Sequence, residues 1–177
     1  MSQTGHLEQV GEVVAALTAL GLQPTMVGGM ALVVLGSQRV TRDFDFVVAQ
    51  PGERLGGLVE ALYGRGFELA SRLDDHGDIS ATIDNPRVAA ARLRIDTPVN
   101  ASFLDPATRL RIDLLFDFPV AAAVIAERAA RRTIRSVVLH IASDEDLLHL
   151  KRIALADRAS ASDAQDIAFL EARLGRG

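Results

Sequence analysis

The sequence predicts one compact domain that mixes helices and strands, either α/β or α+β with a mixed β-sheet. Helix-like and strand-like segments alternate in its first half, a hairpin-like pair follows, and helical spacing returns near the C-terminus. Its 177 residues, of which 49% are hydrophobic, can form one sizeable core. We expect a core domain over residues 1–142 and a C-terminal helical segment over residues 143–177 packed on it.

Residues 7–48 are predicted to form two helices and two strands. Apolar residues recur at helical spacing from Leu7 to Leu20, and Gly21 is typical of a helix end. A short apolar run at Met26–Val27 stops at Gly28-Gly29, and a second helix begins near Met30. Residues 43–48 alternate as a half-buried strand does, with Phe44 and Phe46 on one face.

Further elements follow after residue 48. Asn100–Leu104 and Leu110–Phe116 flank a short polar loop and predict an antiparallel hairpin. The acidic run Asp74–Asp78 is interpreted as a solvated turn, and the basic run Arg128–Arg135 as a solvated helix face. The remaining predicted elements are a helix over Pro51–Tyr63, strands over Phe67–Leu73, Ile79–Ile83 and Val137–Ile141, and helices over residues 144–158 and Asp163–Leu174, the first of them with a capping box at Ser143.

Composition excludes several classes of protein. The net charge of −4 argues against a strongly basic nucleic-acid platform. The absence of cysteine excludes disulfides, thiolate metal sites and cysteine nucleophiles. We expect a cytoplasmic protein without a membrane span, because the N-terminus lacks an apolar leader and no apolar stretch approaches the ~20 residues that a span needs.

Three aspartates form a candidate metal site. Strand periodicity places Asp43 and Asp45 on one face, opposite Phe44. Asp113 lies in a second alternating segment and can stand beside them if the two strands are neighbours. Carboxylates gathered in this way repel one another unless a hard cation such as Mg²⁺ neutralises them. Asp113 could instead pair with Arg109 or Arg111.

The Gly28-Gly29 step, thirteen residues before Asp43, supports a phosphate-binding role. Without a Cβ, its backbone amides can approach a polyphosphate closely. Arg39 and Thr41 are near enough to the aspartates in sequence to contact phosphate or ribose, although Arg39 could equally tether its loop by bonding backbone carbonyls.

These motifs resemble the nucleotidyltransferase signature of the DNA polymerase beta superfamily, and within it the AbiEii-type toxins and related minimal nucleotidyltransferases. The resemblance rests on Val27-Gly28-Gly29-Met30-Ala31, Gly36, and Arg39-Val40-Thr41-Arg42-Asp43-Phe44-Asp45-Phe46. It continues with the Ile-Asp-Leu strand at Asp113, Lys151 on a helix, Arg158, Asp163 and Asp166. At Ser162 the chain departs from the lysine that many such sequences carry before the aspartate.

The resemblance implies transfer of a nucleoside monophosphate from a nucleoside triphosphate to a hydroxyl of RNA, a protein or a small molecule. It implies Mg²⁺ or Mn²⁺ at Asp43, Asp45 and Asp113, with Gly28 and Gly29 forming the phosphate-binding turn. Lys151 would supply positive charge to the triphosphate, although Lys151 and Arg158 could also form snorkelling cover for the core. The implied partner is a cognate antitoxin or toxin. Two alternatives are a catalytically degenerate nucleotide sensor or antitoxin, and an aminoglycoside-type nucleotidyltransferase.

Overall fold

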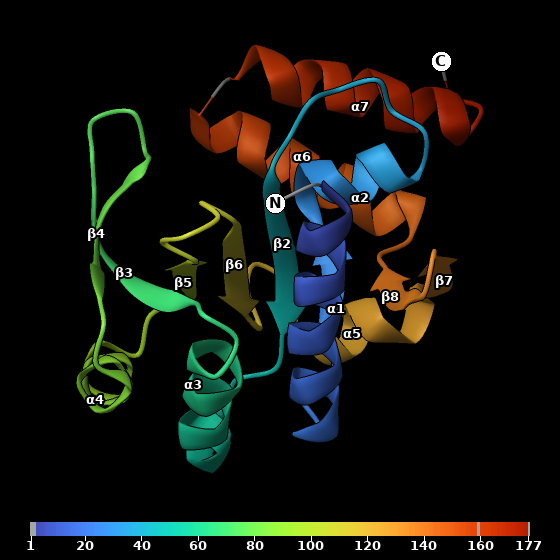
Figure 1. Cartoon of the computed structure of the whole chain (residues 1–177). Coiled ribbons are helices and arrows are strands. Elements are labelled where there is room, and N and C mark those ends of the chain that lie inside the picture. Colours follow the sequence, from blue (N-terminus) through green and yellow to red (C-terminus); the bar gives the residue numbers. More distant parts are fainter. Residues whose placement is uncertain (1–2, 159, 177) are drawn as a thin grey trace.

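The computed structural model describes residues 3–158 and 160–176, which form one eight-stranded sheet and the helices around it (Figure 1). The helices are α1 (Gln3–Ala19), α2 (Gly28–Val34), α3 (Leu55–Tyr63), α4 (Pro86–Asp96), α5 (Ala122–Arg128), α6 (Asp144–Arg158) and α7 (Ala161–Arg173), with a 3₁₀ turn at Gly52–Arg54. The strands are β1 (Thr25–Val27), β2 (Asp43–Val48), β3 (Glu68–Leu73), β4 (Ile79–Ile83), β5 (Asn100–Leu104), β6 (Arg111–Phe116), β7 (Ala130–Ile134) and β8 (Val137–Ile141).

The sheet is mixed, as the sequence predicted. Its strand order is β4-β3-β5-β6-β2-β1-β8-β7. β2 runs parallel to β6 and β1 runs parallel to β8, whereas the other neighbouring pairs are antiparallel. The expected hairpin of residues 100–116 is the β5–β6 pair. Because β6 crosses over to pair with β2, the two segments that carry the aspartates become neighbours.

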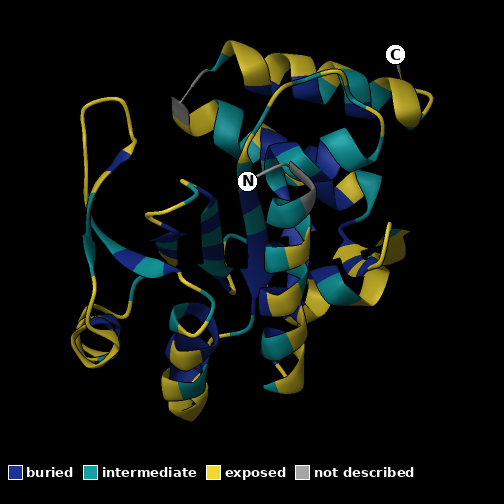
Figure 2. Cartoon of the chain, viewed as in Figure 1, coloured by how far each residue is buried: buried dark blue, intermediate teal, exposed yellow. Residues whose placement is uncertain are grey.

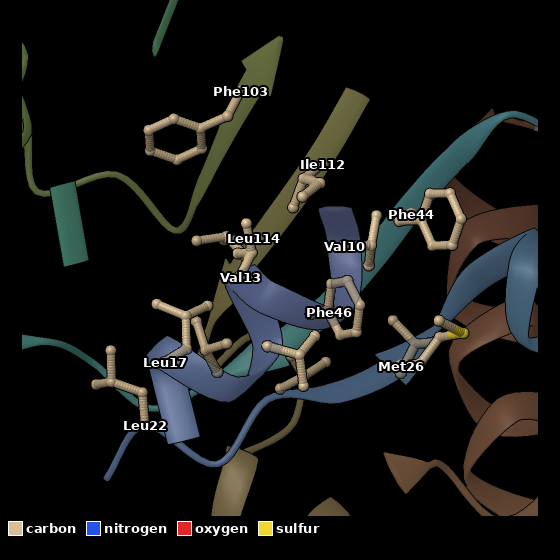
Figure 3. Packing of buried hydrophobic residues seen from close by; sticks show 14 of the residues in the cluster. Val10, Val13, Leu17, Leu22, Met26, Phe44, Phe46, Phe103, Ile112 and Leu114 are labelled. Atoms are coloured by element: carbon tan, nitrogen blue, oxygen red, sulfur yellow. The ribbon is translucent and has the colours of Figure 1, made fainter. Parts of the chain in front are cut away.

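The core lies between this sheet and the helices, chiefly α1. Val10, Val13 and Leu17 of α1 are completely buried, and they occur at helical spacing. They lie on the face of the sheet toward which Phe44 and Phe46 of β2 point (Figure 3). Figure 2 shows the central strands as buried or of intermediate burial, while the turn between β3 and β4 is exposed. Asp43 and Asp45, which alternate with these phenylalanines along β2, therefore lie on the opposite face of the sheet.

The two C-terminal helices pack on each other and beside α2, above the end of β2 at which that strand begins (Figure 1). The predicted cap at Ser143 is present, since its Oγ accepts a hydrogen bond from the Asp146 amide at 3.1 Å and donates one to the Asp146 carboxylate at 2.8 Å. This start fixes the direction of α6. The inner side of α6 consequently faces the Asp-bearing face of the sheet.

The structure corrects the sequence predictions in several elements. Helices α4 and α5 and strand β7 were not predicted. Arg131 and Arg132 lie on β7, not on a solvated helix face, because the edge of β8 takes this segment as its antiparallel partner. Gly28 and Gly29 form the first turn of α2, so the helix starts two residues earlier than expected. No helix in the described part of the chain is long and apolar enough to cross a membrane.

Candidate active site

The three aspartates lie together where β2 and β6 run side by side. In the parallel register Asp45 is opposite Asp113, and Asp43 is opposite Arg111. Neighbouring strands are about 4.8 Å apart, and residues two positions apart share a face. The sheet therefore brings together the three carboxylates that the sequence singled out, on the face opposite Phe44 and α1.

Asp113 already has partners in this arrangement. Its carboxylate accepts a hydrogen bond from the Ser102 hydroxyl and forms an ion pair with Arg111, with 2.9 Å between Nε and Oδ2. Arg111 also donates from Nη1 to the Gly77 carbonyl at 3.0 Å. Asp113 thus lies beside Asp45, where the metal-site hypothesis needs it, and it also pairs with Arg111, as the alternative interpretation expected.

The ionised forms of the other two carboxylates, Asp43 and Asp45, are destabilised by their surroundings. Burial raises the pKa of Asp45 to about 7, with further upward contributions from Asp113 and Asp43 and an opposing one from Lys151. Burial also raises the pKa of Asp43, against the lowering effect of Arg111. Among the described residues, no side-chain hydrogen bond or ion pair is made by Asp43 or Asp45. Such groups would be stabilised in their ionised form by a cation.

The oxygen donors on this face fit a divalent cation in chemistry, because hard cations such as Mg²⁺ are held by carboxylates and share their remaining positions with phosphate oxygens. In the described part of the chain, however, no three acidic or histidine side chains are already gathered as ligands around one point. In this arrangement the Asp113 carboxylate is paired with Arg111.

The two glycines make room for site side chains. A Cβ added to Gly28 would lie 2.2 Å from Oδ2 of Asp45, and Gly28 has a positive φ of +69°. A Cβ on Gly29 would lie 2.7 Å from Cζ of Arg39. The sequence predicts that the missing side chains of Gly28 and Gly29 leave room for a polyphosphate. In the structure this room also accommodates the Asp45 carboxylate and the Arg39 guanidinium.

A buried ionic network forms the opposite wall. Nζ of Lys151 lies 3.0 Å from Oδ1 of Asp163 and 2.7 Å from Oδ2 of Asp166, and all three residues are buried. Arg39 forms an ion pair with the same Asp166. Lys151 is therefore an internal residue and not snorkelling cover on the surface. Arg39 pairs with a side-chain carboxylate, whereas the alternative interpretation expected it to bond backbone carbonyls. The spacing of Asp163 and Asp166, three residues apart on one helix, was the sequence signal for these contacts.

One cleft of about 660 Å³ connects these groups. Its lining residues include Gly28, Gly29, Arg39, Thr41, Asp43, Asp45, Asp113 and Lys151, all of which the sequence predicted for the site. Arg158 ends α6, and its side chain lies outside the described residues. The cleft thus has an acidic floor on the sheet and, on α6 and the loop before β2, a wall whose Lys151 and Arg39 are paired with aspartates of α7.

Sequence reasoning missed two parts of this cleft. One end is apolar and is lined by Val47, Leu115 and Phe118 with side chains of α6. At another side lies the turn between β3 and β4, which is solvated as predicted and is closed by hydrogen bonds from two amides to Asp74. Its tip residues nevertheless line the cleft, because Arg111 holds the Gly77 carbonyl. No local pattern signalled this contact between segments 34 residues apart.

Solved structures identify the fold. The chain is similar to the antibiotic-resistance factor ANT(2'')-Ia, with a TM-score of 0.62 and 13% identity over 98% of this chain and 86% of that one. It is also similar to an antigenic nucleotidyltransferase-like protein from Paracoccidioides brasiliensis, with a TM-score of 0.59 and 17% identity over 96% and 77% of the two chains. No curated protein matches the sequence. The fold is that of the nucleotidyltransferases.

A family match assigns the chain to one group within this fold. Residues 14–175 match the family described as the nucleotidyl transferase AbiEii toxin of type IV toxin–antitoxin systems. This match spans nearly the whole chain, and the protein belongs to that family. The resemblance drawn from the sequence motifs is therefore confirmed, as is the identity of the protein as a nucleotidyltransferase.

Proposed function

We propose that the protein transfers a nucleoside monophosphate from a nucleoside triphosphate to a hydroxyl acceptor and releases pyrophosphate, with divalent metal bound by Asp43, Asp45 and Asp113, as the toxin component of a toxin–antitoxin pair. The observation that carries this proposal is the register of β2 against β6, which places Asp45 beside Asp113 in the cleft that Lys151 and Arg39 also line. Family membership supports the class of reaction.

Each group in the cleft has a role in the proposed reaction. Mg²⁺ or Mn²⁺, held by the three carboxylates, would lower the pKa of the acceptor hydroxyl and neutralise charge on the phosphates. Asp113 orients the acceptor toward the α-phosphate or accepts its proton. Lys151 and Arg39, which also pair with Asp166, face the phosphates from the wall of the cleft, and Gly28 and Gly29 allow the chain to pass close to the phosphates. Thr41 and Arg158 contribute further contacts to the nucleotide.

The proposal is tested first by nucleotide binding. Thermal unfolding is followed with each of the four ribonucleoside triphosphates, with and without Mg²⁺. We expect at least one triphosphate to raise the melting temperature in a Mg²⁺-dependent way, because a ligand that binds only the folded state stabilises it. Asp45→Asn and Asp113→Asn should abolish this increase.

Asp96→Asn is the matched control, because that aspartate lies on the exposed surface of α4 with its side chain 51% exposed. If Asp45→Asn and Asp113→Asn respond to Mg²⁺-triphosphate as Asp96→Asn does, the metal assignment is wrong. A protein that binds triphosphate but transfers nothing to any acceptor would support the degenerate sensor or antitoxin instead.

The acceptor is identified with an α-³²P-labelled triphosphate. The acceptors compared are total tRNA, the proteins of a cell lysate, and an aminoglycoside, and the nucleotidyltransferase product is separated by gel or thin-layer chromatography. The aminoglycoside is included because ANT(2'')-Ia, of similar fold, is known in complex with adenylyl-2''-tobramycin. Label on RNA or on a protein supports the toxin assignment, and label on the aminoglycoside alone supports a resistance function.

A further inference from the structure

A second cavity lies on the other face of β2 from the three aspartates. It has a volume of about 510 Å³, and its wall is apolar. Met26 and Phe44, which Figure 3 shows near α1, line it together with Met30 of α2 and Leu139 of β8. Cavities of roughly 300–1,000 Å³ with apolar walls are typical of sites for small organic molecules.

The polar groups of this second cavity are basic. Within the described part of the chain, its lining contains His6, Arg39, Arg42 and Arg135 and no aspartate or glutamate. Arg39 is already paired with Asp166, and Arg135 has a partner of its own. Arg42 is different, because it is exposed and its side chain makes no hydrogen bond or ion pair with another described residue. An apolar cavity with an available guanidinium at its rim is complementary to a molecule that has an apolar body and an anionic end.

The second cavity and the active-site cleft share part of their lining. The irregular segment of residues 37–42 separates the two, and Arg39 and Thr41 line both of them. Val40, between these two residues, is 89% exposed, so this segment carries a large apolar side chain on the surface. A ligand that displaces the segment on one side would change the position of Arg39 on the other.

We propose that this second cavity binds an amphipathic organic anion, with its apolar body against the partly exposed side chains of Met30, Val33 and Val34 and its anionic group at Arg42. Occupation displaces Arg39 and weakens binding of the triphosphate in the cleft. The binding itself is independent of the proposed nucleotidyl transfer, whereas the effect on the triphosphate rests on it. Affinity changes of this kind are reciprocal, so the triphosphate must weaken binding of the anion by the same factor.

The test of binding uses octanoate, with octylammonium as the probe of equal chain length and opposite charge, in titration calorimetry without nucleotide. We expect octanoate to bind and octylammonium to bind about ten-fold more weakly or not at all, because no acidic side chain among the described lining residues receives the ammonium group. Arg42→Gln should weaken octanoate binding about ten-fold by removing the charged partner. Val33→Trp, at a partly buried position in the wall, should block both probes.

Arg87→Gln is the matched control, an exposed arginine on α4 away from the cavity, and it should bind octanoate as the unmodified protein does. Thermal unfolding of each variant checks that it is folded. Equal affinity for octanoate and octylammonium, or an unchanged affinity in folded Arg42→Gln, overturns the site. So does the absence of octanoate binding at low-millimolar concentration.

The effect on the cleft is measured separately, by titrating Mg²⁺-triphosphate with and without saturating octanoate. A several-fold weaker triphosphate affinity is expected. If octanoate binds with the expected variant pattern and the triphosphate affinity is unchanged, the connection through Arg39 is wrong. If no triphosphate binds in either titration, the proposed nucleotidyl transfer fails, and the octanoate result still decides whether the second cavity is a site.

Discussion

Gly28 offers a stringent test of the site, because its missing side chain is what allows Asp45 to occupy its position. In Gly28→Ala, the new Cβ would lie 2.2 Å from Oδ2 of Asp45, whereas ordinary van der Waals contact begins near 3.4 Å. The carboxylate must therefore retreat by about 1.2 Å, the difference between these two distances. Displacement of a catalytic group by about 1 Å can cost on the order of 100-fold in rate.

The substitution also has a cost for the backbone. Gly28 has a φ of +69°, where a side chain costs about 1–2 kcal/mol. Together with the clash, we expect Gly28→Ala to lower the free energy of unfolding by about 2–3 kcal/mol, measured by urea denaturation. The Mg²⁺-dependent stabilisation by triphosphate should be lost, and nucleotidyl transfer should fall by about two orders of magnitude.

Two other glycines separate these effects. Gly36 also has a positive φ, of +102°, but a Cβ there would meet nothing within 4 Å, so Gly36→Ala reports the backbone cost alone. Gly56 lies on α3 in open space without a positive φ, and Gly56→Ala should be neutral or stabilising by up to about 1 kcal/mol. If Gly28→Ala matches Gly36→Ala both in stability and in its response to Mg²⁺-triphosphate, the contact with Asp45 has no functional importance and the reasoning is refuted.

Three further predictions concern stability. Lys151→Met leaves the fully buried carboxylate of Asp163 without its ammonium partner, so the free energy of unfolding in urea should fall by about 3–5 kcal/mol, and the added change Asp163→Asn should recover part of the loss. Without divalent metal, the free energy of unfolding should decrease as the pH rises from about 4 to about 7. The cause is Asp45, whose pKa is about 7 in the folded protein and near 3.8 when unfolded, because in this window the folded state still binds the proton that the unfolded state has lost. The effect is at most about 4 kcal/mol, and Asp45→Asn should flatten the dependence; an equally steep profile in that variant would contradict the assignment. Gly11→Ala places a Cβ 2.6 Å from Val137, so its melting temperature should fall by several degrees in differential scanning calorimetry, and an unchanged value would show that α1 can shift outward at little cost.

Local patterns were sufficient for the elements with strong periodicity. The strand at Asp43–Val48 alternates, so its two faces were assigned correctly before any partner was known. The cap at Ser143 predicted the start of α6, because the capping hydrogen bonds form within four consecutive residues. By contrast, Ala130–Ile134 carries exposed, polar residues without a core-facing pattern, and only its pairing with β8 makes it a strand. Such edge strands are determined by the sheet they join.

The amino-acid order alone specifies the chemical groups and their local spacing: two carboxylates on one face of β2, a Gly-Gly step before them, a third aspartate on an alternating segment, and Lys151 on a helix. These follow from backbone periodicity, which acts over a few residues. Which of these groups come into contact depends on the packing of the folded chain. The crossover that pairs β6 with β2 places Asp113 opposite Asp45, and the packing of α7 on α6 buries Lys151 between two aspartates. Those contacts join residues far apart in the chain, so they depend on how the whole sheet and its helices pack rather than on any local preference.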